Sequence, residues 1–130
     1  METRVNELYE QWIKLYDEGD PTSAMQLAAP GLVMVTPDGR RLNHNEAVEF
    51  TKQIKVYVDG AGIRRATTIK ALHTTRVSDK SWLLYATVDL LFTTPQGEES
   101  RHSFVEVMAI GPEGIFFDAF SKLADSQNIF

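Results

Sequence analysis

Apolar and polar residues alternate through the second half of the chain, from residue 81 to residue 123. Three runs rich in Val, Ile, Leu, Phe and Thr are separated by two turn sequences, Thr-Pro-Gln-Gly at residues 94–97 and Gly-Pro-Glu-Gly at residues 111–114. Runs of this composition between Pro- and Gly-containing turns are typical of strands joined by hairpins. The pattern therefore predicts a meander of antiparallel strands.

The first of these turns predicts the register of two strands. Pro suits the second position of a type I turn and Gly the left-handed position after it, so a three-residue loop with a bulge pairs Thr94 with Glu98. Counting back from that pair sets Glu106 opposite Ala86, on a face that is otherwise almost wholly apolar. That face carries Trp82, Leu84, Ala86, Val88, Leu90, Phe92, His102, Phe104, Glu106, Met108 and Ile110. A two-residue loop is the alternative: it would move Glu106 opposite Thr87, onto a mixed and more solvated face, and would split the apolar stripe.

The second turn leaves the last strand with two registers. The same turn rule places Asp118 and Phe120 on the Glu106 face, where Asp118 would share a proton with Glu106. The alternative register, suggested by the family resemblance given below, places Phe117, Ala119 and Ser121 there.

Helical spacing of apolar residues marks the first sixty residues. Val5, Leu8, Tyr9, Trp12, Ile13 and Tyr16 predict an amphipathic helix of about four turns that ends at Gly19. Asp20 followed by Pro21 predicts the start of a short second helix, which runs to Ala29 before Pro30-Gly31 stops it.

A short strand at residues 32–36 and a third helix come next. Asn43 with Glu46 three residues later resembles a capping box, and apolar spacing continues the helix to about Asp59, where Gly60 ends it. Residues 63–77 then predict one unusually long strand.

The order of elements predicts an α+β fold in a single domain of residues 1–130. Long strands twist and curl, so we expect a curved antiparallel sheet covered on its concave face by the three N-terminal helices. Helices over a curled sheet make a cone, and a cone not filled by side chains holds a pocket.

Composition excludes several classes of function. A net charge of -5 argues against nucleic-acid binding, and the absence of Cys excludes disulfides and thiolate chemistry. His44, His73 and His102 lie on separate predicted elements without zinc-site spacing, so we expect no metal and no cofactor. No apolar run has the length of a membrane span, and Met1 to Glu7 lack the apolar core of a signal peptide. We therefore expect no membrane partner and a cytoplasmic protein.

Three segments resemble the nuclear-transport-factor-2-like (NTF2-like) cone fold, especially its ketosteroid isomerase and SnoaL-like branch. They are residues 12–20, which end in Asp-Glu-Gly-Asp; residues 34–39, Met-Val-Thr-Pro-Asp-Gly; and residues 104–114, which begin Phe-Val-Glu-Val-Met. The isomerases of that branch use a Tyr, an Asp base and a protonated acid. The resemblance implies that these positions are Trp12, Thr36 and Glu106. Of the three residue types, this sequence keeps only the acid, Glu106. Trp12 replaces the Tyr, and Thr36 replaces the Asp and cannot serve as a base near neutrality.

Glu106 is the predicted catalytic residue if the protein is an enzyme, because burial among apolar residues would raise its carboxyl pKa. The predicted ligand-binding wall is Trp12, Tyr16, Thr36, Phe50, Tyr57, Ala86, Val88, Phe104 and Met108. The first hypothesis is a protein that binds a small, apolar or amphipathic molecule. The alternatives are a cofactor-independent isomerase, cyclase or dehydratase with Glu106 as general acid, and an interaction module with a filled cone.

The opposite face of the meander is also apolar, with Leu83, Tyr85, Thr87, Leu91, Val105, Val107 and Ala109. An apolar area of that size is a liability on a free monomer, so we expect a homodimer through the outer face of the sheet.

Overall fold

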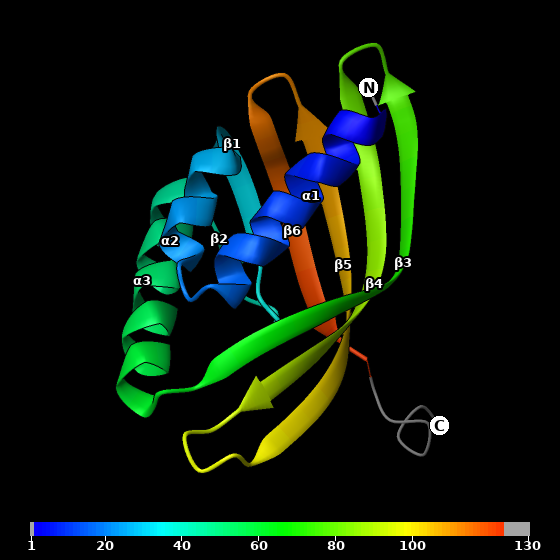
Figure 1. Ribbon diagram of the computed structural model, residues 1–130. Coiled ribbons are helices and arrows are strands. Elements are labelled where there is room, and N and C mark those ends of the chain that lie inside the picture. Colours follow the sequence, from blue (N-terminus) through cyan, green and yellow to red (C-terminus); the bar gives the residue numbers. More distant parts are fainter. Residues whose placement is uncertain (1, 124–130) are drawn as a thin grey trace.

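The computed structural model describes residues 2–123, which form one curved sheet with helices along one side (Figure 1). The elements in order are α1 (Glu2–Asp17), α2 (Pro21–Ala24), the 3-10 helix η1 (Met25–Leu27), β1 (Ala28–Val35), β2 (Arg41–Leu42), α3 (His44–Ala61), β3 (Arg64–Ser78), β4 (Ser81–Thr93), β5 (Glu99–Gly111) and β6 (Gly114–Lys122). The expected α+β cone is confirmed. The domain predicted for residues 1–130 extends beyond the described residues at both ends.

The sheet has the strand order β2-β1-β6-β5-β4-β3. The long strands β3 to β6 pair antiparallel, as expected. β1 lies beside β6 and runs parallel to it, a pairing that the sequence analysis did not anticipate. Parallel neighbours need a long connection, and here the connection is the whole of the chain between β1 and β6. The ends of β3, β4 and β5 sweep round toward the C-terminal end of α3 and give the sheet its hollow (Figure 1).

Helix α1 crosses the concave face of the sheet as a roof (Figure 1). Its buried residues are Val5, Tyr9, Trp12 and Ile13, which repeat at helical spacing as predicted. Full burial of a large apolar side chain contributes roughly 1.5–3 kcal/mol, so Tyr9 and Trp12 are principal anchors of this helix. Both project from the roof toward the sheet.

The second helix is shorter than predicted. Asp20 caps it by accepting a hydrogen bond from the Ser23 N–H at 3.2 Å, and Pro21 opens it, but the helix ends at Ala24 and β1 already begins at Ala28. Pro30 and its neighbour Gly31 therefore lie inside β1, at the point where its register with β6 shifts. Proline is tolerated there because β2 pairs only with the end of β1 and needs no N–H from residue 30.

The capping box predicted for the third helix is confirmed. Asn43 accepts a hydrogen bond from the Glu46 N–H at 2.9 Å, and the Glu46 carboxylate accepts one from the Asn43 N–H at 3.0 Å. The helix runs past Gly60 and ends at Ala61, because it is Gly62 that takes the left-handed conformation, with φ of 65°.

The predicted register of β4 and β5 is confirmed. The Thr94 N–H donates to the Glu98 carbonyl at 2.9 Å, Gly97 takes a φ of 85°, and Glu106 pairs with Ala86. The predicted inner face is the floor of the core, since Leu84, Ala86, Val88, Leu90, Met108 and Ile110 are all buried. The turn chemistry therefore decided between the two registers correctly.

Of the two registers left open for β6, the structure has the one with Asp118 and Phe120 on the Glu106 face. Met108 pairs with Asp118 and Glu106 with Phe120. A bulge between the pairs formed by Ala109 and Ile110 lets Ile115 also face inward. Gly114, at φ of 118°, holds the start of this strand close to the chain entering β1, because a Cβ there would lie 2.4 Å from the Leu27 carbonyl oxygen.

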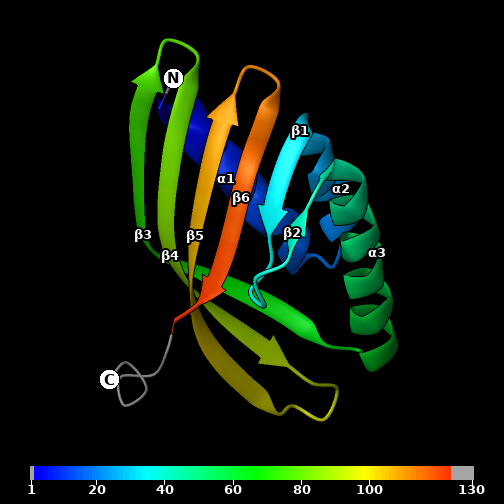
Figure 2. The ribbon, with the colours of Figure 1, turned by 180° about the vertical axis from the view of Figure 1, so that it is seen from behind.

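The far side of the sheet is not covered by any helix in the described part of the chain (Figure 2). Leu83 and Tyr85 of β4 are 42% and 43% exposed on this outer face. The layers are thus helices, then sheet, then an open apolar surface.

Candidate functional site

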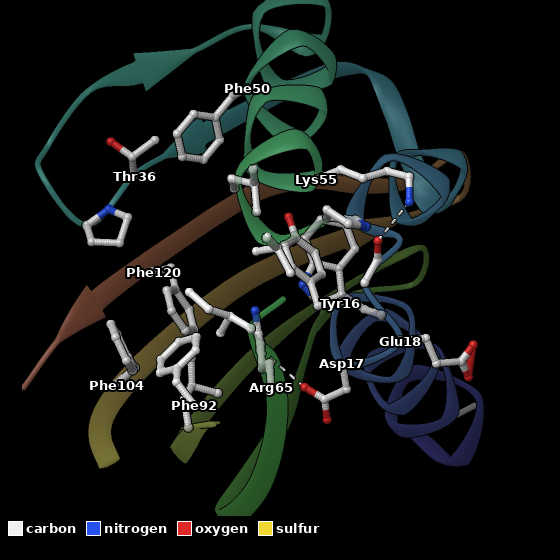
Figure 3. A pocket seen from close by; sticks show the side chains of 18 of the residues that line it. Tyr16, Asp17, Glu18, Thr36, Phe50, Lys55, Arg65, Phe92, Phe104 and Phe120 are labelled. Atoms are coloured by element: carbon white, nitrogen blue, oxygen red, sulfur yellow. Dashed lines mark hydrogen bonds and ion pairs between the residues drawn. The ribbon is translucent and has the colours of Figure 1, made fainter. Parts of the chain in front are cut away.

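A cavity of about 400 Å³ lies between the helices and the concave face of the sheet. Most of its lining is aromatic or aliphatic. Phe50 comes from α3, and the side chains of Phe92, Phe104 and Phe120 gather on the sheet side (Figure 3). Phe104 and Phe120 stack with ring centroids 4.5 Å apart. This is the hollow that the sequence analysis expected.

Glu106 lies in the wall of this cavity and is only 2% exposed. Its Oε1 accepts a hydrogen bond of 3.0 Å from the Tyr9 hydroxyl on α1. The strand register explains the burial, because Glu106 faces Ala86, whose small side chain leaves room for the carboxyl group beneath the helix. The hydrogen bond between Tyr9 and Glu106 thus links α1 to β5.

Asp118 is a second buried carboxyl group in the same wall, 3% exposed. It lies on β6, one strand over from Glu106, and its Oδ1 has no hydrogen-bond donor among the described residues. A buried acceptor without a donor costs free energy, and an ionised one costs more. A proton held between Asp118 and Glu106 lowers this cost, because only one of the two groups is then ionised.

The directions in which the pKa values of the two carboxyl groups shift agree with a shared proton. Burial raises the pKa of Asp118 well above its usual range, and the charge and hydrogen bond of Glu106 raise it further. Burial also raises the pKa of Glu106, although hydrogen bonds from Asp118 and Tyr9 and the positive charge of Arg65 oppose this rise. Like charges this close in a low dielectric cannot both ionise easily. The pair therefore holds one proton between Glu106 and Asp118.

Two tyrosines and a tryptophan of α1 complete the polar roof. Trp12 and Tyr16 lie one turn apart, with ring centroids at 5.2 Å, and both line the cavity. Burial and the nearby carboxyl groups raise the pKa values of Tyr9 and Tyr16 above the ordinary range. Both hydroxyls therefore stay protonated, and the Tyr9 hydroxyl donates to Glu106.

Arg65 is a partly buried cation in the cavity wall. Its side chain is 17% exposed, and its Nε lies 3.1 Å from Asp17 Oδ1 at the end of α1. Asp17 also accepts hydrogen bonds from the Thr67 N–H at 3.0 Å and the Thr67 hydroxyl at 2.6 Å. This pair ties the end of the roof helix to β3.

Thr36 reaches the cavity but offers no base. It is buried, its hydroxyl donates to the Asp38 carboxylate, and it accepts from the Arg40 N–H at 3.1 Å. The bond from Thr36 lowers the pKa of Asp38, which lies in an exposed turn. The site therefore has an acid pair and hydroxyl donors, and Thr36 itself supplies no carboxylate.

Six of the ten predicted site residues line the cavity: Trp12, Tyr16, Thr36, Phe50, Phe104 and Glu106. Ala86, Val88 and Met108 face the same side of the sheet but are fully buried and do not reach the cavity. Their inclusion among the wall residues is corrected, because they are packed within the core.

Tyr57 is also misplaced, because its side chain is 68% exposed and lies outside the cavity. The buried face of α3 is centred on Ala47 and Thr51. Six residues beyond Thr51, a helix has turned about 120° away from that face. Val58, the next residue, returns to that face and lines the cavity.

The sequence analysis missed the site roles of Tyr9 and Arg65. Tyr9 was read only as part of the apolar stripe of the first helix, although it shares a face with Trp12 and Tyr16. Arg65 was not among the predicted site residues, but it pairs with Phe92 and so faces inward. Extending the β4 register to β3 is the signal that could have found it.

Neither a metal-ligand cluster nor a membrane span is found in residues 2–123. No three His, Cys, Asp or Glu side chains of this range come together as a metal-ligand set. Within the same range, no helix has the length and apolar character needed to span a bilayer.

No protein-family model matches this sequence, and no curated protein matches it either. Solved structures of low identity do share its architecture. An NTF2-like superfamily protein from Salmonella enterica serovar Typhimurium superimposes with a TM-score of 0.76 at 12% identity, over 96% of this chain and 92% of that one. A domain with a cystatin-like fold from Nostoc punctiforme gives 0.70 at 17% identity, over 97% and 79%.

A third structure, a Catenulispora acidiphila protein in complex with S-DNPA, superimposes with a TM-score of 0.67 at 15% identity, over 91% of this chain and 90% of that one. Identities this low show the fold alone. The helices over a curved sheet, the cavity between them and these superpositions agree: the chain has the NTF2-like, cystatin-like cone fold.

Proposed function

We propose that the protein binds a small, largely apolar molecule in its cavity, with Glu106 as the polar anchor. The observation that carries the proposal is an apolar hollow of about 400 Å³ whose wall is interrupted by a buried acid pair, Glu106 and Asp118. Small-molecule sites are typically cavities of about 300–1,000 Å³ with mostly apolar walls and a few convergent polar groups. The complex of the Catenulispora acidiphila protein with S-DNPA supports such a use of a cone of this kind.

The aromatic side chains supply the affinity and the acid pair supplies orientation. Rings such as Phe92 and Phe104 remove apolar ligand surface from water, which contributes roughly 25 cal/mol for each Å² buried. A carboxyl pair that holds one proton can both donate and accept a hydrogen bond. It therefore favours a ligand with a hydroxyl or carbonyl group at one end of an apolar body.

A residue in the cavity wall and a neighbour on the same helix provide the test of binding. Val58 lines the cavity, whereas Val56 is 74% exposed on the outside of α3. Val58→Trp is expected to fill part of the hollow and weaken binding of the neutral probe N-phenyl-1-naphthylamine by at least about tenfold, or about 1.4 kcal/mol. Val56→Trp is expected to leave binding unchanged. Fluorescence titration measures both, and equal binding by the two variants would contradict the proposal.

Acid catalysis is the second candidate, favoured by the proton that Glu106 and Asp118 share. A group whose pKa is raised toward neutrality can pass a proton to a substrate oxygen and take one back. Such a step serves isomerases, cyclases and dehydratases, and Thr36 leaves no carboxylate base in the isomerase position.

The rate of substrate conversion in Glu106→Gln tests the catalytic role of Glu106. If a compound that co-purifies with the wild-type protein is converted by it, Glu106→Gln is expected to lower the conversion rate by about 10²–10⁴-fold. Binding of N-phenyl-1-naphthylamine should persist in this variant, because the apolar walls are unchanged. Undiminished conversion in Glu106→Gln would remove Glu106 from the chemistry, and mass spectrometry of the product distinguishes the outcomes.

We also propose that a second copy of the chain covers the outer face of the sheet, where Leu83 and Tyr85 are exposed. Light scattering is expected to give a mass of about twice the 14.7 kDa of one chain. Leu83→Glu should shift the mass toward that of a monomer, because it places a charge in a dry interface, whereas Val56→Glu on α3 should not. A wild-type protein that stays monomeric at high concentration would refute this assembly.

A further inference from the structure

Arg65 presents unused hydrogen-bond donors to the cavity. Only its Nε is engaged, by the Asp17 carboxylate at 3.1 Å and by the Thr67 hydroxyl at 3.5 Å. Within residues 2–123, the terminal nitrogens Nη1 and Nη2 make no hydrogen bond. A guanidinium group carries five donors, and four of them belong to these two nitrogens.

The guanidinium group is held in place before any ligand arrives. Asp17 is itself bonded to the backbone and side chain of Thr67, so the ion pair is anchored to β3 at both ends. The Arg65 Cζ lies 5.0 Å from the centroid of the Tyr16 ring, and stacking of this kind fixes the plane of the fork. Figure 3 shows Arg65 beside Tyr16 with its ion pair to Asp17. A fixed fork loses little entropy when it binds an anion.

Tyr16 adds a donor next to this fork. Its hydroxyl has no hydrogen-bond partner among the described residues, the side chain lines the cavity, and its raised pKa keeps the proton in place. Two other cations line the cavity: Lys55 is already bonded to the Gly19 carbonyl and to Asp59, and Arg64 is exposed to solvent at the start of β3. Arg65 and Tyr16 therefore form a cluster of unengaged donors in a mostly apolar wall.

We propose that the ligand carries an anionic oxygen group, such as a carboxylate, which Arg65 binds through its terminal nitrogens with help from the Tyr16 hydroxyl. The apolar body of the ligand then packs on the phenylalanines of the sheet. The acid pair, Glu106 and Asp118, holds a proton and so carries one negative charge in place of two, which reduces its repulsion of an anion at Arg65. This inference rests on the proposed function and narrows its ligand class to amphipathic acids.

A matched pair of competitors tests the inference at neutral pH. Naphthalene-1-acetate and naphthalene-1-acetamide share one apolar body and differ in the charge of the end group. With N-phenyl-1-naphthylamine as the reporter, the acid is expected to displace it from the wild-type protein at a concentration at least about tenfold lower than the amide, because charge-assisted bonds to a fork are stronger than neutral ones.

Arginine variants test whether Arg65 causes the preference for the acid over the amide. Arg65→Gln is expected to abolish the preference for the acid while the reporter still binds. Arg76→Gln removes the same charge from an exposed site on the same strand and should leave the preference intact. Arg65→Lys keeps a cation for Asp17 but loses the guanidinium fork, so it should reduce the preference for the acid. This variant replaces Arg65→Gln in the test if circular dichroism shows that Arg65→Gln is unfolded.

The outcomes separate the two proposals. If the reporter binds but the wild-type protein prefers the amide or neither competitor, the anion site is wrong and the proposed function stands. A preference that survives in Arg65→Gln also overturns the inference. If the reporter does not bind the wild-type protein at all, the proposed function fails and the inference fails with it.

Discussion

The burial of two carboxyl groups on adjacent strands is the constraint around which the concave side of this protein is built. Glu106 and Asp118 are each at most 3% exposed, and a pair of charges in such a place is costly. The structure meets the cost with a retained proton, with the Tyr9 hydroxyl 3.0 Å from Glu106, and with the cation of Arg65 nearby. Each of these partners comes from a different element, so the acid pair links the roof helix, the sheet floor and the edge strand β3.

The hollow follows from the same arrangement. Long strands curl away from the C-terminal end of α1, while polar contacts tie the helix to the sheet at Asn6–Thr74, at Tyr9–Glu106 and at Asp17–Arg65. The space left near the end of the helix is lined by rings from the sheet and from α3 (Figure 3). A few polar groups in a mostly apolar wall are typical of small-molecule sites.

Local chemistry predicted much of this fold and tertiary context decided the rest. The turn at residues 94–97 carried enough information to place Glu106 opposite Ala86, since Pro and Gly admit few loop geometries. The second turn left two registers for Asp118, because a bulge near Ile115 changes which residues face inward and has no clear sequence signal. The parallel pairing of β1 with β6 depends on contacts far apart in sequence.

Two residues could not be placed correctly from local patterns. Tyr57 was misassigned because apolar spacing alone does not locate the centre of the buried face of a helix. Arg65 was overlooked because its role depends on the register of β3 with β4.

The pH dependence of the unfolding free energy tests the acid pair most directly. Both carboxyl groups have native pKa values above their unfolded ones, so the stability they contribute is full below the ordinary carboxyl range and is lost as pH rises through the raised native values. Above about pH 5, where ordinary carboxyl groups have finished titrating, urea unfolding of the wild-type protein should show a free energy that falls with pH, by at most about 1.4 kcal/mol per pH unit for each proton. Asp118→Asn should flatten this fall. Wild-type and Asp118→Asn curves that run parallel above about pH 5 would contradict a proton shared between Glu106 and Asp118.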